Sequence, residues 1–320
     1  MIISASRRTD IPAYYTEWFM NRIKEEYVLV RNPMNIHQVS KINLSPDVVD
    51  CIVFWTKNPK AMIEQLNNLH EYNYYFQFTL NSYGKDIEAS VPSKKAEVID
   101  TFKRLSDKIG AEKIIWRYDP IFINAKYSIE YHIKYFEKLA RQLRGYTEKC
   151  TISFIDYYSK IMRNIKKLDI HKPSEIDKWV IAENLSKIAF EYGLKMDTCA
   201  EDMAFEDLGI THAKCIDDKL ISRIIKSPIS VDKDKNQRLQ CGCVKSIDIG
   251  LYNTCKNDCK YCYANHSTES VINNMRNYNS KAPLLCSELN DQDKITERNM
   301  KSLKSNQLNQ LDMFTGRGSN

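Results

Sequence analysis

The chain has 320 residues, of which 43% are hydrophobic and 28% charged, and its 47 basic and 41 acidic residues give a formal net charge of +6. This is the composition of a soluble globular protein with one large domain or two small ones. The first residues hold no apolar segment long enough for a signal peptide, and no run approaches the roughly 20 apolar residues of a membrane span. We therefore expect a cytoplasmic protein without a membrane partner, in which clustered thiols are metal ligands and not disulfides.

Short β-rich runs alternate with longer helical patterns along the chain. Several of these runs are continuously apolar or aromatic, as expected of strands that are covered on both faces. The predicted strands are residues 2–6, 51–56, 74–80, 113–118, 150–155, 194–198 and 246–252. The predicted helices are residues 14–26, 59–71, 94–109, 129–143, 174–192 and 220–226.

Repeated alternation of strand and helix predicts an α/β fold with a parallel sheet, and about seven units favour a closed or nearly closed barrel. Residues 27–44 are expected to form a small hairpin outside the barrel. After Tyr263 the composition shifts to Asn, Ser, Lys and Gln. We therefore expect a barrel over residues 1–265 and an irregular C-terminal extension over 266–320, either partly ordered or largely flexible.

Three cysteines, Cys255, Cys259 and Cys262, follow the last predicted strand. Thiols at this spacing can hold three corners of a cube-shaped iron–sulfur cluster and leave one iron open to a non-protein ligand. The alternative is a structural zinc site with Cys241, Cys243 or His266 as the fourth ligand.

The stretch NTCKNDCKYCYA at 253–264 resembles the signature of radical S-adenosylmethionine (SAM) enzymes, which has three cysteines with an aromatic residue before the third. The resemblance implies a [4Fe–4S] cluster on Cys255, Cys259 and Cys262, with SAM at the open iron and Tyr261 beside its adenine. It also implies a one-electron donor such as flavodoxin or ferredoxin, which would drive the cleavage of SAM to a 5′-deoxyadenosyl radical.

The position of this loop is unusual for radical SAM enzymes, most of which carry it after the first strand. The first and last strands of a barrel are neighbours, so moving the chain break around the ring preserves the arrangement. We therefore predict a circularly permuted partial (β/α) barrel of the TIM type, with residues 2–6 beside 246–252. Residues 6–10 then fill the place of the loop that binds the SAM amine, without its usual glycine-rich form.

Several further motifs occur in order along the chain. They are ISASRRTDIP at 3–12, VFWTKNP at 53–59, WRYDP at 116–120, SFID at 153–156 and CGC at 241–243. Together they resemble the domain-of-unknown-function 1848 (DUF1848) family, which looks like a branch of the radical SAM proteins. The short elements TKNP at 56–59 and CYA at 262–264 are also similar to spore-photoproduct-lyase-like proteins, which act on DNA.

Four further cysteines lie upstream of the triplet: Cys199, Cys215, Cys241 and Cys243. Four thiols can complete a second [4Fe–4S] cluster or a zinc site. The alternative is buried free thiols, which are common in cores. A Cys-Gly-Cys sequence in a polar stretch is poor core material and favours a second metal site, whereas Cys51 and Cys150 lie inside apolar strands and are expected in the core.

Polar residues recur where the predicted strands end, and a barrel collects its active site there. An arginine suits the carboxylate of SAM, and an Asp or Asn suits its amine or ribose diol. The predicted SAM-binding residues are Arg7, Arg8 and Asp10, and the predicted catalytic residues are Lys57, Arg117 and Asp119. Each of these assignments has an alternative. Arg7 and Arg8 can be a solvated surface pair, Arg117 and Asp119 a structural ion pair, and Lys57 a solvated residue.

The peptide QLDMF at 310–314 resembles the segment by which bacterial DNA polymerases and repair proteins dock on the sliding clamp. Its apolar residues can bind a preformed groove, or they can pack on the protein's own barrel. We therefore expect a radical SAM enzyme that repairs or modifies a nucleic acid or nucleotide. The alternative is a non-enzymatic, zinc-binding adaptor associated with DNA.

Overall fold

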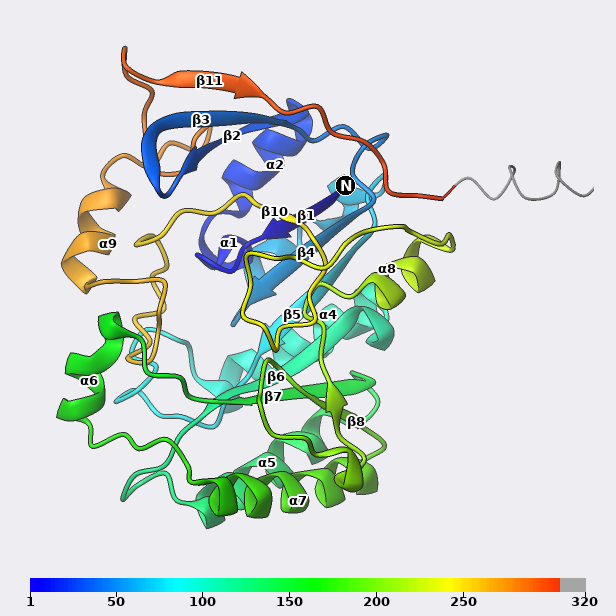
Figure 1. Cartoon of the computed structure of the whole chain (residues 1–320), viewed down its shortest axis with the longest axis vertical. Coiled ribbons are helices and arrows are strands. Elements are labelled where there is room, and N and C mark those ends of the chain that lie inside the picture. Colours follow the sequence, from blue (N-terminus) through cyan, green and yellow to red (C-terminus); the bar gives the residue numbers. More distant parts are fainter. Residues whose placement is uncertain (306–320) are drawn as a thin grey trace, which may run out of the picture.

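The computed structural model describes residues 1–305 and is built around an eight-stranded parallel sheet (Figure 1). Its spatial order is β10 (Ile247–Asp248), β1 (Ile2–Ala5), β4 (Cys51–Thr56), β5 (Tyr74–Thr79), β6 (Ile114–Ile121), β7 (Lys149–Phe154), β8 (Lys195–Thr198) and β9 (Thr211–His212). Every neighbouring pair is parallel, so the carboxyl ends of all the strands lie at one edge. The two outermost strands, β10 and β9, do not pair with each other, so the sheet is open.

Helices and short helical turns connect the strands. The α-helices are α1 (Ile11–Tyr14), α2 (Thr16–Lys24), α3 (Lys60–Ile63), α4 (Ile99–Ile109), α5 (Ile129–Leu143), α6 (Met162–Lys167), α7 (Glu175–Glu191), α8 (Asp218–Ile225) and α9 (Thr268–Met275). The 3-10 turns are η1 (Leu66–Leu69), η3 (Ala111–Lys113), η4 (Ser159–Ile161) and η5 (Glu206–Leu208), and η2 (Lys94–Val98) is a π-turn. Helix α7 begins with a capping box between Ser174 and Asp177, which satisfies backbone donors at its first turn.

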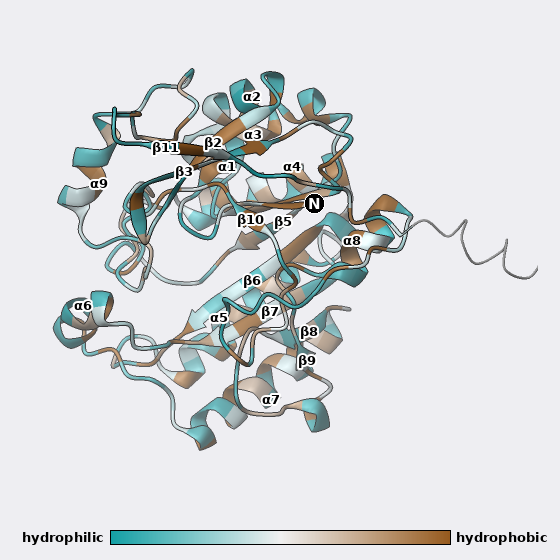
Figure 2. Cartoon of the chain, turned by 45° about the horizontal axis from the view of Figure 1, so that its top comes forward, coloured by the Kyte–Doolittle hydropathy of each residue, from teal (hydrophilic) through white to brown (hydrophobic). Residues whose placement is uncertain are grey.

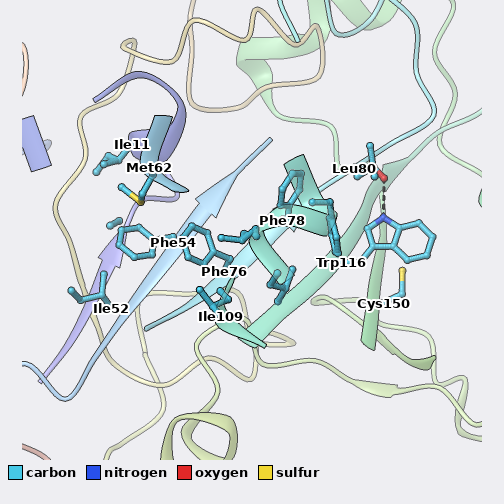
Figure 3. Packing of buried hydrophobic residues seen from close by; sticks show 14 of the residues in the cluster. Ile11, Ile52, Phe54, Met62, Phe76, Phe78, Leu80, Ile109, Trp116 and Cys150 are labelled. Carbon is cyan, nitrogen blue, oxygen red and sulfur yellow. Dashed lines mark hydrogen bonds between the residues drawn. The ribbon is translucent and has the colours of Figure 1, made fainter. Parts of the chain in front are cut away.

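One face of the sheet packs against helices α4, α5 and α7 and forms the main core (Figures 1 and 3). Aromatic side chains dominate it: Phe54 stacks on Phe76 with ring centroids 4.8 Å apart, and Trp116 stacks on Phe136 of α5 at the same 4.8 Å. Figure 3 shows the Trp116 indole donating to the Leu80 carbonyl at 2.9 Å, which satisfies its buried N–H. Buried aromatic rings contribute about 1.5–3 kcal/mol each, so this face anchors the sheet.

The opposite face of the sheet changes character along the strands. Near the strand starts it is apolar, where Val53 and Ile115 pack with Ile221 of α8. Nearer the strand ends it carries buried polar side chains, among them Gln77, Arg117, Thr151 and Asp197. Successive side chains of a strand point to opposite faces of the sheet. The polar residues alternate along the strands with the residues of the helix-covered core, so they lie on the other face. Figure 2 shows the resulting mixture of brown and teal along the sheet.

The structure confirms the predicted α/β fold with a parallel sheet, and β1 lies beside β10 as predicted, paired through Ile3 and Ser4. The hairpin expected over 27–44 is also confirmed, as β2 (Tyr27–Asn32) and β3 (Asn35–Asn43). Some elements are shorter than predicted. The helix expected over 59–71 is reduced to α3 and η1, because the Asn side chains at 67 and 68 favour turns over helix. The last strand pairs over two residues only.

Beyond the main sheet, residues 266–305 include α9 and the strand β11 (Lys294–Glu297). β11 pairs in parallel with β3 and extends the hairpin to a three-stranded sheet (Figure 1). The predicted clamp-docking peptide at 310–314 lies outside the described residues. Within residues 1–305, no helix has the length and apolar character needed to cross a bilayer.

Candidate functional site

The cysteine triplet lies in a compact loop that leaves the carboxyl end of β10. The loop is closed at its base by a backbone hydrogen bond from Asn253 to Ala264 at 3.0 Å, and the Asn265 amide donates to the carbonyl of Cys255 at 2.7 Å. Asn253 and Asp258 adopt left-handed backbone angles, with φ of 59° and 50°. Asn and Asp tolerate this conformation better than other non-glycine residues, so the sequence suits the tight path of the loop.

The loop is docked on the segment that follows β5. Glu88 and Cys259 form an antiparallel bridge, Lys260 donates its backbone N–H to Ile87 at 2.9 Å, and Ser90 donates to Asn257 at 3.1 Å. The triplet is therefore fixed between two strand ends, in the position where parallel sheets place their ligand sites.

Asp10 connects the triplet loop to two neighbouring strands. Its carboxylate accepts from the backbone N–H of Lys57 at 2.8 Å, the side chain of Asn257 at 3.1 Å and the N–H of Ala13 at 3.0 Å. The Tyr14 hydroxyl donates to Asn257 at 2.7 Å. Burial raises the pKa of Asp10, although these hydrogen bonds oppose the shift. The structure thus places Asp10, a predicted SAM ligand, beneath the loop as a positioning residue.

Asp248, which the sequence analysis did not select, joins β10 to the end of β1. It accepts hydrogen bonds from Ser4 at 2.7 Å, Ser6 at 2.6 Å and the N–H of Arg7 at 2.8 Å. Gly250 follows immediately, and a Cβ atom there would lie 2.1 Å from the Ser6 hydroxyl oxygen. The loop can therefore approach β1 this closely only because residue 250 has no side chain.

Two cavities meet at the triplet. The first has a volume of about 420 Å³ and is lined on one side by Tyr261 and Cys262. The second has a volume of about 460 Å³ and is lined by Cys255, Cys259 and Cys262. Both volumes fall in the roughly 300–1,000 Å³ range of small-molecule sites. Cys262 faces both cavities, so the triplet stands at the wall between them.

Burial raises the pKa of all three triplet thiols, that of Cys255 to about 12. The loop alone therefore does not supply thiolates, and a bound metal would have to displace the protons. Within residues 1–305, no three His, Cys, Asp or Glu side chains converge as the ligands of one metal ion do.

Five of the seven predicted SAM-binding and catalytic residues line the first cavity. They are Arg7, Lys57, Arg117, Asp119 and Tyr261. The other two do not: Asp10 lies under the loop, and Arg8 turns away to donate to the carbonyl of Gly250 at 3.3 Å and to stack over the Tyr252 ring at 5.2 Å.

Arg7 is the residue at the first cavity whose hydrogen bonding is incomplete. Its guanidinium lies 5.1 Å over the Trp55 ring, and its buried Nη2 atom has no hydrogen-bond partner among the described residues. A buried guanidinium nitrogen without a partner is unfavourable, so this atom is available to a ligand that accepts hydrogen bonds.

Lys57 and Tyr261 belong to a buried network around Glu88. The Lys57 ammonium contacts the Glu88 carboxylate and the Tyr261 hydroxyl, each at 2.8 Å, and Lys94 contacts the other Glu88 oxygen at 2.5 Å. Burial alone would raise the pKa of Glu88, but the ion pairs with Lys57 and Lys94 outweigh it and hold that pKa at about 2. Glu88, which the sequence analysis missed, is thus a buried anion that fixes Tyr261 beside the triplet.

Arg117 and Asp119 form an ion pair at the end of β6. Arg117 also donates to the thiol sulfur of Cys215 at 2.8 Å and to the amide oxygen of Gln77 at 3.4 Å. The ion pair between Arg117 and Asp119 is thus present, and both residues line the first cavity, where Arg117 contacts Cys215.

The four upstream cysteines meet at the first cavity although they come from three separate segments. Cys199 follows β8, Cys215 follows β9, and Cys241 and Cys243 precede β10. The sulfurs of Cys199 and Cys215 lie 3.3 Å apart, too far for a disulfide, and Cys243 hydrogen-bonds to both Cys215 and Cys241. The thiols thus form a continuous chain, and all four line the same cavity.

The pKa values of these four thiols are shifted in opposite directions. Hydrogen bonds from Cys199 and Cys243, with Arg117 nearby, hold the pKa of Cys215 well below its usual range. A hydrogen bond from Cys243 likewise lowers the pKa of Cys241 to about 6. The two donating thiols have raised pKa values as a result. Cys215 and Cys241 therefore lose a proton more readily than ordinary cysteines, and the thiolate is the form that binds metals.

The rim of the second cavity is basic. Its cationic residues are Lys160, Arg163, Lys167, Lys256 and Lys260. Its acidic residue, Asp258, is paired with Lys260 at 2.8 Å. A surface of this kind attracts an anionic partner to the outer side of the triplet.

The fold and the site together define an α/β protein with a three-cysteine loop and a thiol-lined cavity at the carboxyl edge of its parallel sheet. The model of the family described as domain of unknown function (DUF1848) matches residues 2–264. The chain belongs to the DUF1848 family, as its motifs predicted. The match includes every strand of the main sheet and the whole triplet. No curated protein matches the chain.

Proposed function

We propose that this protein is a radical SAM enzyme whose catalytic [4Fe–4S] cluster is held by Cys255, Cys259 and Cys262. The observation that carries the proposal is the triplet loop itself, which is docked at the carboxyl edge of a parallel sheet and opens into a cavity. A cluster with three protein ligands leaves one iron free to bind a small molecule. When bound and reduced, the cluster supplies the electron that cleaves SAM.

The residues around the first cavity fit SAM. The unpartnered nitrogen of Arg7 suits the SAM carboxylate, since arginine binds carboxylates as a planar donor. Tyr261 is held by Lys57 and Glu88, and on this proposal its ring would contact the adenine. Trp55 packs against Arg7 and helps to exclude water from that position.

The strand arrangement supports a circular permutation of the radical SAM barrel. The triplet follows β10, which is late in the chain, yet β10 pairs with β1 near its start. Residues 6–10 then occupy the place of the loop that binds the SAM amine. Their backbone groups would bind the amine although the usual glycines of that loop are absent. On this proposal the open sheet is a partial barrel whose interior is the first cavity.

We propose a nucleotide or nucleic acid as the substrate class. The unpartnered nitrogen of Arg7 at the first cavity suits a ligand that carries phosphate or carboxylate, whereas Lys57 and Arg117 are already paired with carboxylates. The similarity of residues 56–59 and 262–264 to spore-photoproduct-lyase-like proteins points in the same direction. The alternative function remains a zinc-binding adaptor associated with DNA.

The test is anaerobic reconstitution of the protein with iron and sulfide. We expect a brown protein that absorbs near 400 nm and forms 5′-deoxyadenosine from SAM after reduction with dithionite. Cys259→Ala should abolish that product, whereas Cys51→Ala, in the buried strand β4, should leave it. A colourless protein with about one zinc per chain would support the adaptor in place of the enzyme.

A further inference from the structure

A second group of thiols faces the first cavity, which Cys262 of the triplet also lines. Cys199, Cys215, Cys241 and Cys243 are all lining residues there, as is Cys262. We infer that these four thiols hold a second [4Fe–4S] cluster, so that a ligand in the cavity lies between two clusters. This inference rests on the proposed function only for the identity of the first cluster.

The surroundings of the four thiols are those of an anionic centre. Arg117 donates to the sulfur of Cys215 at 2.8 Å, and Ile216 donates its backbone N–H to the sulfur of Cys243 at 3.4 Å. Arg7, with its unpartnered nitrogen, lines the same cavity as Cys215 and Cys243 and interacts electrostatically with both. Four thiolates around an iron–sulfur core carry a net negative charge, which the Arg7 guanidinium opposes, while Arg117 is shared between Cys215 and Asp119.

The arrangement does not suit thiols that serve only as packing. On one side, Cys215 and Cys243 contact the apolar residues Ile216 and Val244. On the other side they face a cavity and cationic groups. A thiol that only packs as a small apolar side chain is not expected to accept a hydrogen bond from a buried arginine. We therefore interpret the apolar residues as the surroundings of a ligand site.

The spacing of Cys241 and Cys243 favours a cluster over a single zinc ion. Zinc ligands near each other in sequence are usually separated by two to four residues, whereas only Gly242 separates Cys241 from Cys243.

Gly242 explains how both cysteines reach the site. A Cβ atom at this position would lie 3.1 Å from the Lys214 side chain and 3.3 Å from the carbonyl of Ala213. The Cys-Gly-Cys segment thus passes close to the backbone that leads to Cys215. A second cluster with four protein ligands has no open iron, so its chemistry at the cavity is electron exchange.

The test compares variants of the two cysteine groups in the full chain after anaerobic reconstitution. We expect about eight iron and eight sulfide per chain in the wild type. Cys255→Ser/Cys259→Ser/Cys262→Ser should keep about four iron and show, when reduced, a paramagnetic signal that SAM does not alter. Cys241→Ser/Cys243→Ser should also keep about four iron and still cleave SAM. The control is Cys150→Ser, in the core, which should keep about eight.

The outcomes separate this inference from the proposed function. If the wild type holds about four iron, and the triplet variant holds none or a single zinc, the second cluster is refuted while the radical SAM proposal stands. If the triplet variant keeps about four iron and Cys241→Ser/Cys243→Ser loses all of it, the second cluster stands and the first is refuted. A wild type without iron overturns both.

Discussion

Glu88 is the residue on which the geometry of Tyr261 depends. Its side chain is 1% exposed, and it accepts from two lysines and a tyrosine. A buried carboxylate of this kind stabilises the fold only while its partners are present, because an unpaired charge in the interior is strongly unfavourable. Lys57, Lys94 and Tyr261 therefore act as one unit with Glu88.

Replacing Glu88 with Gln should destabilise the protein by about 3 kcal/mol at neutral pH, since it leaves two buried ammonium groups unpaired. The pKa of Glu88 in the folded protein is about 2, below its ordinary value of 4.5, so the ion pairs stabilise the fold above pH 4.5. That stability is lost as the pH falls from about 4.5 through 2. Urea unfolding of both proteins at several pH values measures this.

Glu64→Gln is the matched control, because the Glu64 carboxylate is exposed and pairs with Arg104 at the surface. Exposed ion pairs contribute little, so this variant should unfold close to the wild type at every pH. A difference between Glu88→Gln and wild type that did not change with pH would contradict the assignment.

The junction between β10 and β1 is the element on which the triplet loop depends. β10 pairs over two residues only, so its backbone hydrogen bonds hold it weakly. Asp248 compensates by accepting from Ser4, Ser6 and Arg7. Side-chain hydrogen bonds thus replace the longer ladder of an ordinary strand.

Gly250→Ala should disturb this junction. The added Cβ collides with Ser6, so the loop must shift, and a clash of this kind typically costs about 1–3 kcal/mol. We expect the reconstituted variant to bind SAM several-fold more weakly than wild type, measured by the change that SAM causes in the spectrum of the reduced cluster.

Gly145→Ala controls for general destabilisation. Its φ of 81° makes alanine unfavourable there, but no atom lies within 4 Å of the added Cβ, and the position is remote from the triplet. We expect lower thermal stability with unchanged SAM binding. Equal losses of SAM binding in both glycine variants would show that Gly250 acts only through stability.

At the scale of the whole molecule, the triplet has an inner and an outer side. The first cavity is lined by Arg7 and Tyr261, two of the predicted SAM-binding residues, whereas the basic rim belongs to the second cavity. In Figure 1, α6 and α9 flank this outer side. We therefore expect an acidic electron-transfer protein, such as flavodoxin or ferredoxin, to dock on the outer side while substrate occupies the inner one.

Arg163→Glu/Lys167→Glu should slow cluster reduction by a protein donor about tenfold or more at low salt, because charge complementarity sets the association rate. Added salt should slow the wild type and affect the variant little. Stopped-flow absorbance of the cluster measures both rates. Lys103→Glu, on α4 and remote from the cavity, is the control, and equal slowing there would contradict a specific docking surface.

Much of the fold could be predicted because its signals are local. Continuous apolar strands and amphipathic helices such as α5, which was predicted at its observed bounds, follow from side-chain periodicity. The two-residue strands β9 and β10 could not be delimited in this way, because their pairing depends on contacts with distant segments.

The candidate site was predictable where its residues lie within a strand, near its carboxyl end. Arg117 and Asp119 belong to β6 itself, and both line the first cavity. Beyond a strand the alternation is lost, so the sequence could not show that Arg7 enters the cavity while Arg8 turns away. Glu88 lies in an irregular segment, and only the three-dimensional structure places it beside Tyr261.

The pairing of β10 with β1 joins residues that are far apart in the chain, as the Ser4–Asp248 hydrogen bond spans 244 positions. During synthesis, the edge of β1 that pairs with β10 stays unpaired until residues 247–248 have left the ribosome. Such distant contacts slow folding, and exposed edges invite aggregation in the meantime. On the proposed function, iron would therefore enter this loop only in chains synthesised well beyond residue 262, after β10 has paired with β1.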